Sequence, residues 1–181
     1  MTLYAIAVIL PDEIGKELDR LRNEFSKNMV YIPIPHLTLV YPFTPTIDIT
    51  ALIDKLKQVA ETAAPFILTL NGIGYFEGKN NVAYVAVANI KPVINLHRKI
   101  IFSLAGLLKD ELKDEQGNFN LDRFVHHVTI GELIPDEILA ELKRHMSKNI
   151  THYETEVTSF SLFVRNEDGR WMTDNRFALA A

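Results

Sequence analysis

Several segments of the chain are rich in apolar and β-branched residues, and many of them alternate apolar with polar positions. Both features are typical of β-strands, whose successive side chains project from opposite faces of a sheet. We therefore predict strands over Leu3–Leu10, Phe66–Phe76, Val82–Ala88, Phe124–Ile130, Tyr153–Val164 and Arg170–Leu179, and extended chain that holds a further strand over Val30–Phe43. The short polar stretches Glu77–Asn81 and Asn166–Gly169 join neighbouring strands and predict two hairpins.

Other segments space their apolar residues three and four positions apart, which is the pattern of a helix with one buried face. The predicted helices run from Pro11 to about residue 26, from Asp48 to about Val59, from Pro92 to about Leu112 and from Pro135 to about Met146. Proline suits the first turn of a helix, and the Asp48 carboxylate can cap the second one. The polar stretch Lys113–Asp122 predicts a loop.

The order of these elements contains two helix-then-strand stretches and two hairpins, which suggests an ancient duplication. We predict an α+β protein in which antiparallel sheets carry helices on their outer faces. Since 181 residues are enough for one good core and too few for two independent domains, we expect one unit over residues 1–181.

Two predicted strands, one in each half of the chain, carry the same short motif. His36-Leu37-Thr38-Leu39 and His127-Val128-Thr129-Ile130 both read His-x-Thr followed by an apolar residue. Because residues i and i+2 of a strand project from the same face, each histidine points the same way as its threonine. Pro33, Pro35 and Pro42 surround the first motif and predict that its strand lies near the edge of a sheet or enters the sheet from a loop.

An imidazole beside a hydroxyl, supplied twice, suits a reaction that needs a proton acceptor, a proton donor and hydrogen bonds to an anion. Cleavage or transfer of a phosphoester is such a reaction. A single histidine on a strand is more often structural than catalytic, and threonine is common in strands because of its high β-propensity. The inference of catalysis therefore depends on the repetition of the motif. A pseudo-twofold axis would place both motif strands across one cleft.

Other histidines and a glycine-rich segment give no evidence of a second functional site. His126 should point away from its neighbour His127 and is expected to be structural or exposed, while His97 and His152 have no evident catalytic partner. The segment Gly72–Gly74 lacks the third glycine and the following helix of a dinucleotide-binding loop, so we predict a bulged strand there.

Composition narrows the possibilities further. The chain has no cysteine, which excludes disulfides, thiolate chemistry and cysteine-based metal sites, and fits a cytoplasmic location. Leu3–Leu10 is too short to span a bilayer and lacks a basic leader, so neither export nor a membrane partner is expected. A net charge of −4 disfavours wrapping a long polyanion by charge alone, but it is compatible with a small phosphate ligand or one RNA terminus.

The segments Pro35–Leu39 and His127–Gly131 resemble the paired H-x-T/S motifs of the 2H phosphoesterase superfamily, and in particular its branch of 2'-5' RNA ligases and cyclic phosphodiesterases. The size of the chain and the order of its elements are also similar. The resemblance implies a bilobal, duplicated fold with two antiparallel sheets lining a central cleft. It further implies metal-independent hydrolysis of 2',3'-cyclic phosphates, with 2'-5' RNA ligation in related members.

On this hypothesis His36 and His127 are the catalytic acid and base, in an order that the sequence leaves open. Thr38 and Thr129 donate hydrogen bonds to the phosphate oxygens. Arg123 has the strand parity of His127 and is a candidate phosphate ligand, and Tyr41 is a candidate for stacking on a base. No metal or cofactor is required. The expected partner is an RNA terminus or a small cyclic nucleotide, bound by a monomer.

Two other classes of function remain open from the residues alone. A metal-dependent hydrolase could use His36, His127 and a carboxylate such as Glu132 as ligands. A noncatalytic binder of RNA ends or nucleotides could use the same cleft without turnover.

Overall fold

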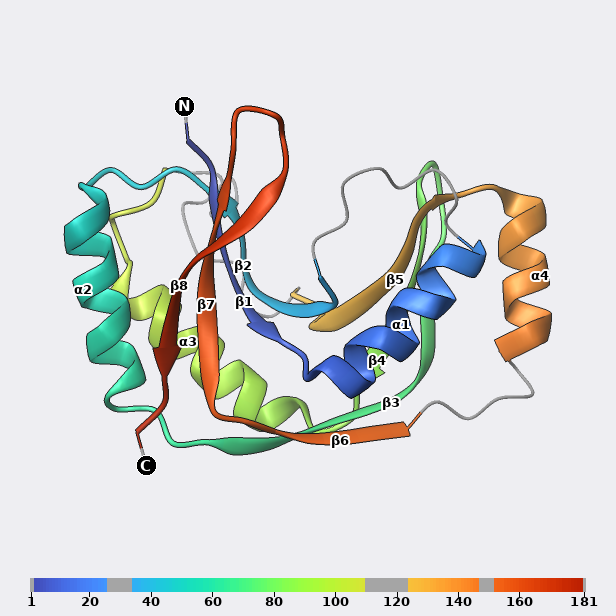
Figure 1. Cartoon of the computed structure of the whole chain (residues 1–181), viewed down its shortest axis with the longest axis horizontal. Coiled ribbons are helices and arrows are strands. Elements are labelled where there is room, and N and C mark those ends of the chain that lie inside the picture. Colours follow the sequence, from blue (N-terminus) through green and yellow to red (C-terminus); the bar gives the residue numbers. More distant parts are fainter. Residues whose placement is uncertain (1, 26–33, 110–123, 147–151, 181) are drawn as a thin grey trace.

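The computed structural model describes residues 2–25, 34–109, 124–146 and 152–180 (Figure 1). In these residues the chain forms two four-stranded antiparallel sheets and four helices, as the α+β prediction requires. The strands are β1 (Tyr4–Ile9), β2 (His36–Phe43), β3 (Phe66–Phe76), β4 (Asn81–Val87), β5 (His127–Ile134), β6 (His152–Val157), β7 (Ser159–Arg165) and β8 (Trp171–Ala178).

The first sheet has the strand order β2-β1-β7-β8 and the second has the order β5-β4-β3-β6. Each motif strand, β2 or β5, is therefore an edge strand, which confirms the prediction from the prolines around His36. The two edge strands contact each other in the middle of the molecule, and the sheets diverge from there (Figure 1). This arrangement brings the two motifs to the junction of the two lobes.

The helices are α1 (Asp12–Phe25), α2 (Ile49–Ala60), α3 (Ile90–Ser103) and α4 (Asp136–Met146). Asp48 caps α2, since its Oδ1 accepts a hydrogen bond of 3.0 Å from the backbone N–H of Ala51. Helix α2 packs on β8 and α3 on β2, whereas α4 packs on β4. Helix α1 follows a strand of the first sheet yet packs against β5 of the second, so it ties the two lobes together.

Apolar side chains from both sheets and all four helices form one continuous core. Its fully buried members include Leu37 and Leu39 on β2, Val128 on β5 and Ile100 on α3. In the motif strands the residues between the histidine and the threonine thus face the core, which leaves His36, Thr38 and their counterparts on the opposite face. No described helix combines the length and the apolar character needed to cross a bilayer.

Three predicted boundaries are wrong. The third helix ends at Ser103 instead of near Leu112, because Gly106 has a φ of 77° and the chain then turns to a bridge between Leu108 and Pro45. The strand of the second motif begins at His127 instead of Phe124 and continues to Ile134.

The predicted strand Tyr153–Val164 is two strands, β6 and β7, that belong to different sheets. Strand β6 pairs with β3 as far as Val157, and β7 pairs with β1 and β8 from Ser159 onward. The alternation of apolar and polar positions changes phase there, because Tyr153 and Val157 are followed by Phe160 and Leu162, and the prediction of one continuous strand overlooked this sign.

The predicted bulge in Gly72–Gly74 is confirmed by a shift in the β3–β4 register and by the φ of 77° at Gly72. Gly74 is needed for a second reason, since the ring of its β4 partner Tyr84 lies across it. A Cβ at position 74 would be 2.3 Å from that ring.

Candidate active site

The two motif histidines are held in the same way. Each is the first residue of its edge strand and is half-buried. Nδ1 of His36 donates to the carbonyl of Ile34 at 2.8 Å, and Nδ1 of His127 donates to the carbonyl of Val125 at 2.6 Å. Because a carbonyl can only accept, the proton of each neutral ring is on Nδ1, and Nε2 keeps a lone pair that can take a proton.

The two strands that carry the motifs match position by position. Both begin with a half-buried histidine and a half-buried threonine separated by a buried apolar residue, and both end in two exposed residues and a buried one. The strand register is also shifted at the same place in both, directly after Thr38 and after Thr129. Two independent segments therefore have the same bulged geometry, which supports the inferred duplication.

The imidazole of His36 lies within electrostatic range of the other motif. Burial lowers the pKa of His36, and the positive charges of Arg22 and His127 lower it further, against the opposing effect of the hydrogen bond to Ile34. The neutral form of His36 is therefore favoured at neutral pH. The contact between β2 and β5 likewise brings the two motif strands together at the junction of the lobes.

A phenylalanine contacts each motif histidine from an equivalent position, on the strand next but one to the motif strand. The ring centroid of Phe163 on β7 is 5.8 Å from that of His36, and Phe76 on β3 is 5.2 Å from His127. The lobes differ on the strand that lies between the histidine and the phenylalanine. On β1 the residue paired with Thr38 is Ala7, whereas on β4 the residue paired with Thr129 is Tyr84. The second lobe therefore has the larger aromatic surface, and its Phe76 is 37% exposed.

The carbonyl of each motif threonine accepts a hydrogen bond from the other half of the chain. Nε and Nη2 of Arg22, on α1, donate to the Thr129 carbonyl at 3.0 and 2.8 Å. Nδ1 of His126 donates to the Thr38 carbonyl at 3.3 Å. These bonds connect the exposed edge of each motif strand to the opposite lobe and fix the position of its threonine.

Arg22 was not singled out from the sequence, although it is only 3% exposed. The signal was present: Arg22 is four residues after Leu18 and one after Leu21, on the buried stripe of α1. Burial lowers its pKa, but nearby Asp19 favours the charged form. A cation at an apolar position of a helix indicates a specific partner, which here is the carbonyl of Thr129.

His126 and His97 belong to a buried cluster beside the motif, and both are only 3% exposed. Their ring centroids are 5.0 Å apart, and Phe124 packs on both rings. Nδ1 of His97 donates to the carbonyl of Leu39. Burial lowers the pKa of His126 to about 4 and also lowers that of His97. Both rings are therefore neutral structural groups, as the sequence suggested for His126.

Of the two further candidates for substrate binding, Arg123 and Tyr41, Arg123 lies outside the described residues. Tyr41 is 46% exposed, and its ring packs at 4.5 Å on Phe124, in the cluster of His97 and His126. It is out of phase with His36 and Thr38 on β2 and contacts neither motif histidine in the ring contacts described. Phe43, on the same strand, is fully buried in the core.

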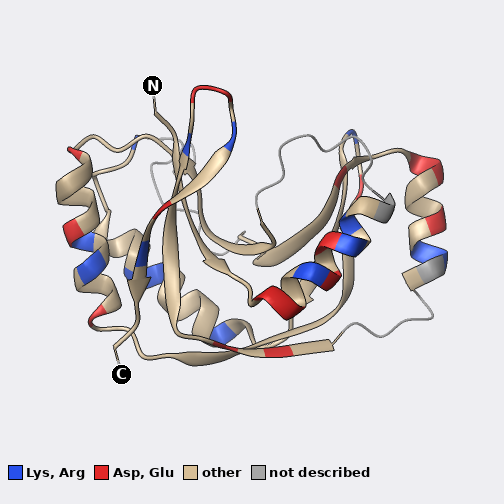
Figure 2. Ribbon diagram, viewed as in Figure 1, with Lys and Arg blue, Asp and Glu red and all other residues tan. Residues whose placement is uncertain are grey.

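Charge is sparse on the motif strands, which carry Glu132 as their single Asp, Glu, Lys or Arg residue. Charged residues gather instead on α1, α2 and α4 (Figure 2). Within the described residues, no three His, Cys, Asp or Glu side chains come together as a group that could hold a metal ion. Glu132 therefore forms no such group with His36 and His127.

Comparison with known proteins gives a consistent result. The chain matches the model of the 2'-5' RNA ligase superfamily over residues 10–169. Proteins of Bacillus anthracis and Bacillus cereus, provisionally named phosphoesterases, are 27% identical to it over 177 residues, which is 95% of this chain and 94% of theirs.

Two solved structures show the same fold. A protein of Thermus thermophilus superposes with a TM-score of 0.66 at 21% identity, covering 99% of this chain and 98% of its own. Escherichia coli LigT in complex with 3'-AMP superposes with a TM-score of 0.60 at 18% identity, covering 99% of each chain.

Proposed function

The chain belongs to the 2'-5' RNA ligase superfamily, as the two motifs suggested, and from that premise we propose that it is a metal-independent phosphodiesterase. Its substrates are 2',3'-cyclic phosphate ends of RNA or cyclic nucleotides, and His36 and His127 act as base and acid. The observation that carries this proposal is the matched pair of edge-strand histidines, each with Nδ1 tied to a carbonyl and Nε2 left for chemistry.

In the proposed reaction a water molecule attacks the phosphorus while the Nε2 of one histidine takes its proton. The bond from phosphorus to one ribose oxygen breaks, and that oxygen takes a proton from the second, protonated histidine. The product is a ribose monophosphate. The lowered pKa of His36 supports the base role for this residue and the acid role for His127.

The hydroxyl groups of Thr38 and Thr129 donate to the nonbridging oxygens, where negative charge develops in the transition state. A ribose 5'-hydroxyl in place of water would give ligation: it loses its proton to the base, and the P–O3' bond breaks to leave a 2'-5' linkage. The complexes of LigT with 3'-AMP and with phosphate support a ligand of this class.

Incubation of the protein with 2',3'-cyclic AMP in excess chelator, followed by phosphorus NMR, tests the proposal. We expect conversion of the cyclic phosphate into one monophosphate, and the chemical shift identifies which oxygen keeps the phosphate. Turnover that disappears in chelator would support the metal-dependent alternative, and binding without turnover would support a noncatalytic binder of RNA ends.

A further inference from the structure

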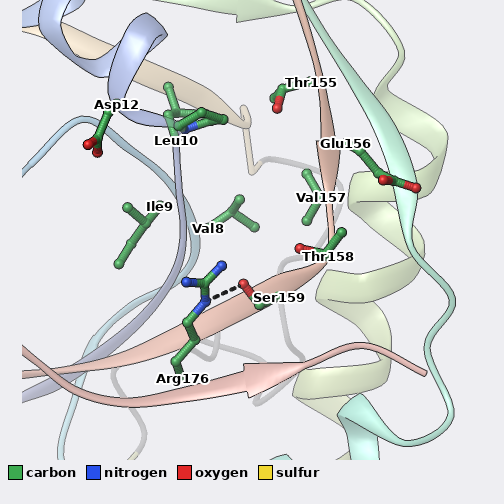
Figure 3. A pocket seen from close by; sticks show the side chains of 11 residues that line it. Val8, Ile9, Leu10, Asp12, Thr155, Glu156, Val157, Thr158, Ser159 and Arg176 are labelled. Carbon is green, nitrogen blue, oxygen red and sulfur yellow. Dashed lines mark hydrogen bonds between the residues drawn. The ribbon is translucent and has the colours of Figure 1, made fainter. Parts of the chain in front are cut away.

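A pocket of about 280 Å³ opens where β1 and β7 separate from each other (Figure 3). We refer to it as the Arg176 pocket. It is lined by Val8–Asp12 at the end of β1, by Thr155–Ser159 at the junction of β6 and β7, and by Arg176 on β8. The proposed function uses none of these residues.

The Arg176 pocket lies on the same sheet face as the first motif. Thr38 pairs with Ala7, Ala7 with Ser161, and Ser161 with Arg176, so these four residues form one row across β2, β1, β7 and β8. Directly paired residues of an antiparallel sheet project from the same face. Three strand spacings separate Thr38 from Arg176, which is roughly 14 Å between their backbones. Ile9, which lines the pocket, is the β1 partner of His36.

The chemistry of the pocket suits an anion. Arg176 is exposed, and its Nε donates to the hydroxyl of Ser159 at 2.8 Å, which leaves the Nη atoms to contact a ligand. Figure 3 shows the guanidinium reaching toward Val8 and Ile9, while the carboxylate of Glu156 points away from it and Asp12 lies beyond Ile9. A guanidinium with a neighbouring hydroxyl binds the two nonbridging oxygens of a phosphodiester.

We propose that the Arg176 pocket binds a backbone phosphodiester upstream of the cyclic phosphate, so that the preferred substrate is an oligonucleotide end and not a free cyclic nucleotide. This inference rests on the proposed function of the motif site. The distance from Thr38 to Arg176 is that of one or two nucleotides in an extended strand, once the reach of the arginine side chain is included. The Arg176 pocket then holds the upstream phosphodiester, and the motifs hold the terminus.

The test compares 2',3'-cyclic AMP with the dinucleotide adenylyl-adenosine 2',3'-cyclic phosphate, in the intact protein and in Arg176→Gln. We expect kcat/KM of the intact protein to favour the dinucleotide by about tenfold or more, with an advantage that declines as salt is added. Arg176→Gln should bring the ratio of the two kcat/KM values close to one, mainly through KM for the dinucleotide. Arg176→Lys should retain part of the preference because it keeps the charge.

Arg144→Gln is the matched control, since it removes one positive charge from α4 and should leave the ratio unchanged. Equal kcat/KM values for both substrates in the intact protein would overturn the proposal. So would an equal loss on both substrates in Arg176→Gln. Absence of turnover of either substrate would reject the proposed function itself, and the assignment of this pocket would fall with it.

Discussion

At the scale of single residues, catalysis is assigned to two imidazoles that are half-buried and not part of the core. Replacing His36 or His127 with Ala should therefore lower kcat on a cyclic phosphate by about 10²- to 10⁴-fold with little change in the fold. The exposed His152 provides the control, and His152→Ala should keep full activity. An active double variant of His36 and His127 would refute the assignment.

Arg22 should affect both stability and the pH dependence of the reaction. Arg22→Met removes two hydrogen bonds to the Thr129 carbonyl, and loss of its charge should raise the pKa of His36. Since the base must be neutral, the limb of the kcat/KM profile on which activity rises with pH should move to higher pH. Arg22→Lys retains the charge and should keep that limb while lowering kcat. An unmoved limb in Arg22→Met would contradict this electrostatic role.

At this scale the sequence predicted functional residues only where the spacing between two residues fixes the direction of their side chains. His-x-Thr on a strand fixes a shared direction for two side chains, so His36, Thr38, His127 and Thr129 could be chosen without a structure. The roles of Arg22 and Phe163 depend on which strand packs against which helix or ring. No local pattern contains that information, apart from the position of Arg22 on an apolar stripe.

At the scale of elements, two glycines test the packing described for β3 and α1, because Gly74 is crowded by a neighbouring ring and Gly15 is not. Gly74→Ala would place a Cβ 2.3 Å from the ring of Tyr84, so it should destabilise the fold and disturb the ring contact of Tyr84 with His127. Gly15→Ala lies within α1 with open space around it, and it should stabilise the protein by about 0.5–1 kcal/mol. Denaturant unfolding of both variants measures the difference, and equal effects would contradict the described packing.

Most elements follow from periodicity and turn chemistry, including the β3–β4 hairpin, the cap at Asp48 and the edge position of β2. The errors lie where a tertiary contact decides the boundary. The end of α3 depends on the turn at Gly106 and the bridge from Leu108, and the break at Thr158 depends on β6 and β7 pairing in different sheets.

At the scale of the whole molecule, buried neutral histidines at the junction of the lobes should make the fold sensitive to acid. The pKa of His126 is about 4, against 6.5 in an unfolded chain. Between these values the unfolded chain binds a proton that the folded one does not, so stability falls as pH falls, by about 3 kcal/mol from His126 alone. The lowered pKa values of His97 and His36 act in the same direction.

Denaturant unfolding at pH 7.5 and pH 4.5 should therefore show a large loss of stability in acid. His126→Phe should reduce that loss because it removes the titrating group, whereas His152→Phe should not. If His126→Phe lost as much stability in acid as the intact protein, the burial of a neutral His126 would be refuted.

The duplicated architecture was predictable from two motifs and the order of the elements, but the connection between the lobes was not. Helix α1 crosses to the second sheet, and the carbonyls of Thr38 and Thr129 are bound by residues of the opposite half. These contacts join segments far apart in the sequence. Arg22 and His126, which make them, occupy positions that look like ordinary helix or strand positions in the sequence.

The central claim is that two imidazoles from opposite lobes act on one phosphorus. A crystal structure of the protein with a bound adenosine 2'-monophosphate measures this most directly. We predict that the phosphate oxygens lie within hydrogen-bond distance of Nε2 of both His36 and His127, with the hydroxyl groups of Thr38 and Thr129 donating to the same phosphate. A phosphate bound by one histidine alone, or away from both, would contradict the account.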